Sequence, residues 1–201
     1  MRLFITLCFL GLIQSFAYAA ITVTPISDTI SIKIENFSNK NMVDSLLNKL
    51  KPYSINDASS IIIDLRNNNG GFIYEAISIA ALFVDQKELI TIIDQSGKNL
   101  TITRPKDHPF ISTKRLLIIM NNNTASAAEG AISILNLHPR STTFGEQSYG
   151  KKRISSISNN HSPYQSLKIP SSGIKPDIPL SFSKISSYDS QILKVISLSN
   201  K

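Results

Sequence analysis

The sequence has very little cysteine and no tryptophan. Its 201 residues include one cysteine, Cys8, within the first few positions. Residues 20–201 therefore have no thiol nucleophile, no disulfide and no cysteine-based metal site. Without tryptophan or a basic stripe interleaved with aromatic residues, the composition argues against nucleic-acid binding. The 21 basic and 14 acidic residues are scattered, except for a short cluster at residues 151–153, and indicate only a mild attraction to anionic surfaces.

Long apolar runs are also absent. A short apolar run at residues 3–13 follows Arg2 and is followed by Ala17-Tyr18-Ala19. This pattern is typical of a signal peptide with an A-x-A cleavage site. This run is too short to span a bilayer, and no later segment reaches the necessary length. We expect residues 1–19 to be a signal peptide. Residues 20–201 should then form one domain that is exported, periplasmic or secreted, and does not span the membrane.

Apolar strands alternate with helices along the rest of the chain. The runs at residues 60–65 and 115–120 are continuously apolar, which is typical of strands buried on both faces. Further strands are expected at 29–36, 88–94, 99–103 and 142–145, helices at 39–53, 73–84 and 125–136, and two or three more strands in the tail around a loop at 170–179. This alternation predicts an α/β fold.

Two of the expected strand-to-helix junctions carry small and polar residues. One contains Gly70 and Gly71, and the other contains Ser126 between two alanines. In α/β folds such junctions lie at the carboxyl ends of parallel strands, where helix amino termini offer free N–H groups. The amides of Ala127 and of a glycine at the first junction suit a developing oxyanion. Each feature alone also has an ordinary explanation, because serine often caps a helix and Asn-Gly-Gly often forms a turn.

A serine nucleophile needs a base. His108, His138 and His161 lie in polar or proline-containing segments, and their spacing selects none of them. A lysine can serve when burial keeps it neutral, because a low-dielectric environment disfavours the ammonium. Lys151 is a candidate because it follows a tight turn after a predicted strand, although most lysines are solvated surface residues.

Residues 145–151 also match most of a phosphate-loop pattern. The next residue is Lys152, so the serine or threonine hydroxyl that would bind magnesium is missing. We therefore expect no nucleotide, no metal and no other cofactor.

Taken in order, these motifs resemble the carboxyl-terminal processing, or tail-specific, peptidases. The resemblance covers about residues 30–180, and its Ser126-to-Lys151 offset of 25 positions is also that of the family. Four segments carry it: Asp64-Leu65-Arg66-Asn67-Asn68-Asn69-Gly70-Gly71, Asn121-Asn122-Asn123-Thr124-Ala125-Ser126-Ala127-Ala128-Glu129, Gly145-Glu146-Gln147-Ser148-Tyr149-Gly150-Lys151 and Gly173-Ile174-Lys175-Pro176-Asp177.

The resemblance implies a single-domain, ClpP/crotonase-like spiral of βαβ units. It also implies a serine endopeptidase that cleaves exported or tail-exposed, unstructured polypeptide through an acyl-enzyme. Ser126 would be the nucleophile and Lys151 the base, and the amides of Ala127 and of Gly70 or Gly71 would form the oxyanion hole.

The sequence departs from the family pattern in three places. We expect no PDZ domain between Ala20 and Thr29. An aspartate that some members place eleven residues after the serine is Leu137 here, and a glutamine four residues after the lysine is Ser155. The group that orients Lys151 is therefore Ser155, Glu129 or neither. Glu129 could share a helix face with Ser126, or be a solvated acid in the first helical turn.

These departures leave an alternative function open. The chain could be a catalytically degenerate member that binds extended peptides by strand addition, or that assembles with a partner or as an oligomer. Acyl-CoA chemistry on the same fold is disfavoured by the expected export and by the Ser-to-Lys offset.

Overall fold

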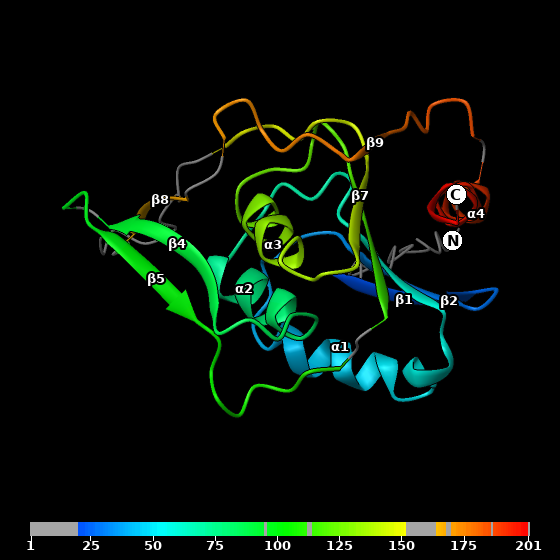
Figure 1. The fold of residues 1–201 in the computed structure, drawn as a ribbon, viewed down its shortest axis with the longest axis horizontal. Coiled ribbons are helices and arrows are strands. Elements are labelled where there is room, and N and C mark those ends of the chain that lie inside the picture. Colours follow the sequence, from blue (N-terminus) through cyan, green and yellow to red (C-terminus); the bar gives the residue numbers. More distant parts are fainter. Residues whose placement is uncertain are drawn as a thin grey trace, which may run out of the picture.

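The computed structural model describes residues 20–94, 96–111, 114–151, 164–167, 170–185 and 187–200. The predicted signal peptide, His161 and Ser155 lie outside these residues. Within them the chain forms a six-stranded sheet with the order β1-β2-β3-β6-β7-β9 and a three-stranded sheet with the order β5-β4-β8 (Figure 1).

The six-stranded sheet is mainly parallel. Its strands are β1 (Ile21–Ile26), β2 (Thr29–Ile34), β3 (Ser60–Asp64), β6 (Arg115–Met120), β7 (Ser141–Gly145) and β9 (Ile178–Pro179). Only β1 runs antiparallel to its neighbour, while β2, β3, β6, β7 and β9 pair in parallel. Parallel neighbours need crossover connections, which contain α1 (Met42–Leu50), α2 (Ile73–Ala81) and α3 (Ala127–Leu135). The carboxyl ends of β2, β3, β6 and β7 therefore meet at one edge of the sheet.

The three-stranded sheet is antiparallel and lies beyond α2 and α3, on the side of these helices away from the larger sheet (Figure 1). Its strands are β4 (Glu88–Asp94), β5 (Asn99–Thr103) and β8 (Tyr164–Leu167). Leu89, Ile92 and Leu167 join the same hydrophobic cluster as α2 and α3. This insertion therefore extends the main core of a single domain.

The central strands are buried on both faces, as the continuous apolar runs predict. In β3, Ile61 and Ile63 pack into the cluster under α1, α2 and α3, whereas Ile62 packs into a second cluster on the opposite face. That second face is covered by α4 (Tyr188–Ser199), whose Ile192 and Val195 are fully buried. A short 3₁₀ helix, η1 (Ile55–Asp57), precedes β3.

The tail is where the sequence-based expectation is partly wrong. Two short strands, β8 and β9, are present among the described residues, but the last element is the helix α4. Ser187 begins α4 by accepting a hydrogen bond from the Ser190 N–H, and Ile192 and Val195 recur at helical spacing. The strand β1 was also not anticipated.

The other expected strands and helices are confirmed, with ends displaced by a few residues. The domain is a mixed α/β fold with a mainly parallel sheet, as predicted. Among the described helices, none combines the length and the apolar character that a membrane crossing requires.

Candidate active site

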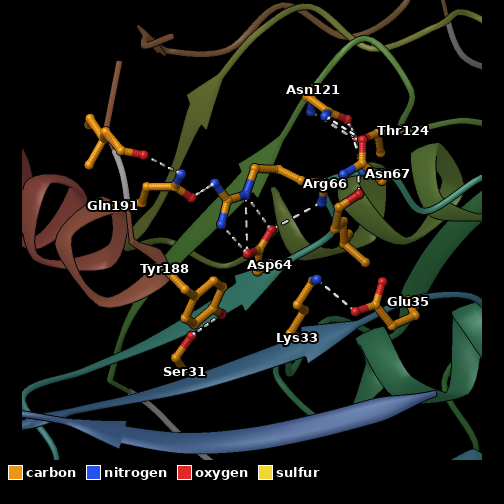
Figure 2. Close-up of polar contacts among 12 residues, drawn as sticks. Ser31, Lys33, Glu35, Asp64, Arg66, Asn67, Asn121, Thr124, Tyr188 and Gln191 are labelled. Atoms are coloured by element: carbon orange, nitrogen blue, oxygen red, sulfur yellow. Dashed lines mark hydrogen bonds and ion pairs between the residues drawn. The ribbon is translucent and has the colours of Figure 1, made fainter. Parts of the chain in front are cut away.

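The two polar strand-to-helix junctions meet at the edge formed by the carboxyl ends of the strands, because they follow the neighbouring strands β3 and β6. We call residues 67–71 the glycine loop and residues 121–127 the serine turn. The Ala125 N–H donates to Asn68 O at 2.9 Å, and the Asn67 N–H donates to Asn121 Oδ1 at 2.9 Å. Just before the glycine loop, Leu65 O accepts from Thr124 Oγ1 at 2.8 Å (Figure 2). The two segments therefore form one hydrogen-bonded unit.

Ser126 occupies a sharp turn at the start of α3. Its backbone has φ 59° and ψ −122°, a region that non-glycine residues rarely adopt. Holding a residue there costs on the order of 1–3 kcal/mol and requires firm support from its surroundings. The support includes the Glu129 carboxylate, whose Oε2 accepts from the Ser126 N–H at 2.9 Å. A partly exposed serine on a strained strand-to-helix turn is the geometry in which α/β hydrolases present a nucleophile.

The glycine loop passes directly in front of the Ala127 amide. A Cβ atom at Gly70 would lie 3.0 Å from Ala127 N and 2.9 Å from Ser126 Cβ. That separation from Ala127 N is the distance at which an oxyanion would accept its hydrogen bond. A side chain at position 70 would therefore press on the serine turn, and glycine avoids this contact.

The two glycine amides differ in their availability. The Gly70 N–H already donates to Asn68 Oδ1 at 2.9 Å. The amides of Gly71 and Ala127 have no hydrogen-bond partner among the described residues. Of the two glycines expected to donate, Gly71 is thus the one with a free N–H.

Glu129 links the serine turn to the loop that carries the lysine, residues 146–151, which we call the lysine loop. Its side chain is fully buried, so the alternative of a solvated first-turn acid is wrong. Oε1 accepts from Ser148 Oγ at 2.6 Å and from Gly150 N at 2.7 Å, and Oε2 accepts from Ser126 N and from Lys151 N at 2.8 Å. A single carboxylate thereby satisfies four donors from both segments.

Lys151 comes close to Ser126 through this shared carboxylate oxygen. The two backbone nitrogens lie 2.8 and 2.9 Å from Glu129 Oε2, so they are no more than about 5.7 Å apart, the sum of these distances. The Lys151 side chain is exposed, however, and its Nζ has no hydrogen bond to Ser126 or to any other described residue. The buried amine that a lysine base calls for is therefore not found in this structure.

The described histidines lie away from Ser126. His108 Nε2 contacts Ser78 O at 2.8 Å, and His138 Nδ1 accepts from Arg140 N at 3.1 Å beyond the carboxyl end of α3. Burial lowers the pKa of His138, with the nearby Arg140 charge as a second cause. Neither ring contacts the serine turn, so among the described residues no histidine pairs with Ser126.

The closing segment, residues 173–177, braces the lysine loop. Ile174 and Ser148 exchange two hydrogen bonds, and a Cβ at Gly173 would collide with Ser148 O at 2.1 Å. Asp177 accepts from the N–H and the hydroxyl of Thr143 at 2.8 and 2.9 Å. The roles of Ser148, Asp177 and Asn68 were not predicted, because motif membership was their only signal in the sequence.

The described residues contain no group of three or more histidine, cysteine or acidic side chains placed to hold a metal ion. The groups that the structure brings together here are the Ser126 hydroxyl, the buried Glu129 carboxylate and main-chain donors. A serine hydroxyl beside main-chain donors, at the carboxyl ends of parallel strands, is an arrangement suited to acyl transfer.

A serine at a strand-to-helix turn agrees with the family that the sequence comparison finds. The chain belongs to peptidase family S41, whose sequence profile matches residues 28–175. The resemblance noted from the motifs is thereby confirmed over nearly the predicted range.

Several relatives of known name are carboxyl-terminal-processing peptidases. The chain is 29% identical over 126 residues to the chloroplastic carboxyl-terminal-processing peptidase 2 of Arabidopsis thaliana, covering 63% of this chain and 24% of that protein. It is 28% identical over 176 residues to peptidase 3 of the same plant, covering 81% and 34%. The carboxyl-terminal-processing protease of Synechocystis is 29% identical over 126 residues, covering 63% and 29%. The chain thus spans about a quarter to a third of these relatives' lengths.

Solved structures share the fold. A photosystem II D1 C-terminal processing protease superposes with a TM-score of 0.71 at 20% identity, covering 90% of this chain and 53% of the other. A lipoprotein from Streptococcus agalactiae gives a TM-score of 0.69 at 19% identity, covering 91% and 70%. Their likeness shows that the architecture is that of known S41-type folds.

Proposed function

We propose that this chain is the catalytic core of a serine endopeptidase that cleaves unstructured polypeptide, at exposed tails in particular. The observation that carries the proposal is the Glu129 carboxylate, which holds the backbones of Ser126 and Lys151 together next to the Ala127 amide. The names of the relatives support carboxyl-terminal tails as substrates. The signal-peptide pattern at residues 1–19 supports export, to the periplasm or outside the cell.

In the proposed reaction, Ser126 Oγ attacks the carbonyl carbon of the scissile peptide bond while its proton passes to the neutral Nζ of Lys151. The N–H groups of Ala127 and Gly71 stabilise the negative oxygen of the tetrahedral intermediate. When the C–N bond breaks, Lys151 returns the proton to the leaving amine, and an ester to Ser126 remains. Water then hydrolyses this ester by the same proton transfers.

The proposal requires Lys151 to lose its charge. Its side chain is exposed to water in this structure. A polypeptide bound along the serine turn would exclude that water, and the neutral amine would then be favoured next to Ser126. Cleavage should accordingly increase with pH, because the base must be deprotonated.

The test compares cleavage of an unfolded protein by wild type, Ser126→Ala, Lys151→Ala and the double variant. We expect each single variant to lose at least about 10³-fold in kcat, and the double variant to lose no more, because nucleophile and base act as a unit. Ser45→Ala and Lys49→Ala, at exposed positions on α1, are matched controls that should retain full activity. Equal activity in all variants would refute the dyad.

The exposed Lys151 side chain favours a second candidate, a degenerate member that binds extended peptides without cutting them. The same proteins distinguish the two. If wild type leaves the substrate intact but binds a labelled peptide, and Ser126→Ala binds it equally well, the binding function is supported and the peptidase function fails.

A further inference from the structure

Arg66 is the last residue before the glycine loop and forms a buried ion pair with the end of β3. Its side chain is largely buried and that of Asp64 is fully buried. Arg66 Nη2 lies 2.6 Å from Asp64 Oδ2, and Nε lies 2.9 Å from Oδ1, so the pair is bidentate (Figure 2). The backbone N–H of Arg66 also donates to Asp64 Oδ1 at 3.0 Å. The point at which the glycine loop leaves the sheet is therefore fixed by this pair.

The other sides of the guanidinium are enclosed by the carboxyl-terminal segment. Gln191 of α4 accepts a hydrogen bond from Arg66 Nη1 through its Oε1 (Figure 2). The ring of Phe182 lies 4.3 Å from Arg66 Cζ, close enough for a cation–π contact. Gln191 is itself oriented, because its Nε2 donates to Ile185 O at 3.0 Å.

Arg66 and Gln191 line a cavity that is also lined by residues of the glycine loop and the serine turn. This polar cavity, of about 330 Å³, has Asn67 of the glycine loop and Asn121 of the serine turn in its lining. Asn121 Nδ2 donates to Asn67 Oδ1 at 2.8 Å, which joins the glycine loop to the serine turn. Asn67 itself has φ 62°, so the loop bends sharply directly after Arg66.

We propose that Gln191 is a positioning residue for the oxyanion donors, acting through Arg66. This inference rests on the peptidase function proposed above. Arg66 held from two directions sets the path of the glycine loop, and with it the place of the Gly71 N–H relative to the Ala127 N–H. Oxyanion stabilisation needs both donors at about 2.7–3.1 Å from the oxygen, and misplacement by about 1 Å can reduce the rate 10²-fold.

The experiment compares Gln191→Met with Gln191→Glu. Methionine keeps the length of the side chain but accepts no comparable hydrogen bond. The glutamate carboxylate still accepts from Arg66, although it cannot donate to Ile185 O as Gln191 does. We expect Gln191→Met to lower kcat about 3- to 10-fold with KM changed less than about twofold, and Gln191→Glu to retain a higher kcat than Gln191→Met. Leu193→Met, at an exposed position of the same helix, is the matched control and should behave as wild type.

Hydrogen exchange of the Gly70 amide, which donates to Asn68 Oδ1, gives a readout that does not depend on activity. It should be faster in Gln191→Met than in wild type and Gln191→Glu, at a temperature where all three are folded. If wild type is active, and Gln191→Met has the same kcat and the same exchange rate as wild type, the positioning role is refuted. An inactive wild type refutes the peptidase function instead, and the exchange rates then decide by themselves whether Gln191 orders the glycine loop.

Discussion

Glu129 shows how one buried side chain can organise a site without touching the substrate. Its two oxygens accept four hydrogen bonds, three of them from backbone N–H groups of the serine turn and the lysine loop. A buried carboxylate is costly unless its oxygens are fully bonded, and here they are. The carboxylate thus stabilises both the strained Ser126 backbone and the approach of Lys151.

Glu129→Gln should destabilise the protein and slow the reaction. The amide nitrogen cannot accept a hydrogen bond, so two of the four donors would lose their partner. At about 1–3 kcal/mol for each unsatisfied buried donor, we expect a loss of about 2–6 kcal/mol in the free energy of unfolding. Urea denaturation measures it, with the exposed Glu88→Gln as control. A Glu129→Gln variant as stable and as active as wild type would contradict the role given to this carboxylate.

Gly70→Ala should reduce activity far more than stability. The added Cβ would lie 3.0 Å from Ala127 N, the donor that the proposed mechanism assigns to the oxyanion, and 2.9 Å from Ser126 Cβ. Blocking one oxyanion donor should lower kcat by about 10²- to 10³-fold.

The control for this change is Gly97→Ala. Gly97 also has a positive φ, of 82°, but a Cβ there meets nothing within 4 Å. Both variants carry backbone strain, yet only Gly70→Ala should lose activity when kcat is measured on an unfolded substrate. Similar kcat values for the two variants would argue against an oxyanion site beside Ala127.

At the scale of elements, α4 completes the second layer of the domain. The faces of β3 and β6 that point away from α1, α2 and α3 carry Ile62, Leu117 and Ile119, all buried. Ile192 and Val195 of α4 belong to the same cluster. The burial of both faces was predicted from the sequence, but the element that covers the second face was taken for strands, because the serine-rich tail has a weak helical pattern.

Ile192→Ala should destabilise the whole domain. Truncating a fully buried isoleucine costs about 2–5 kcal/mol, through lost burial and the cavity that remains. Denaturant unfolding measures the change, and Leu193→Ala, about half exposed on the same helix, should shift it by no more than about 0.5 kcal/mol. If both variants unfold at the same denaturant concentration, α4 does not contribute to the core as described.

At the scale of the whole molecule, global stability should depend on pH in the mildly acidic range. Burial lowers the pKa of His138 below its ordinary value of 6.5. The unfolded chain therefore takes up a proton at this residue near pH 6.5, while the folded chain takes it up only at lower pH. In that interval the unfolded state binds more protons, so the free energy of unfolding falls as pH falls.

The variant His138→Gln tests this contribution, because glutamine does not titrate and can still accept from the Arg140 N–H. Its free energy of unfolding should fall less steeply than that of wild type as the pH is lowered from 7 to 5. Parallel curves for the two proteins would show that His138 does not contribute.

The sequence alone determined those features that depend on local spacing. Continuous apolar runs identified the central strands, helical periodicity identified α1, α2 and α3, and ordered motifs identified the family and the segments that carry Ser126 and Lys151. Parallel pairing then implied that polar junctions following neighbouring strands meet at one edge.

Only the tertiary structure decided which groups face one another across long stretches of chain. Glu129 bonds Lys151 N across 22 residues, and Arg66 bonds Gln191 across 125. The tertiary structure also decided that the Gly70 amide is used by Asn68, while the Gly71 amide has no partner among the described residues, and that Lys151 is exposed. Such contacts depend on burial and on hydrogen bonds between distant segments, and these arise only when the packed core brings the segments together.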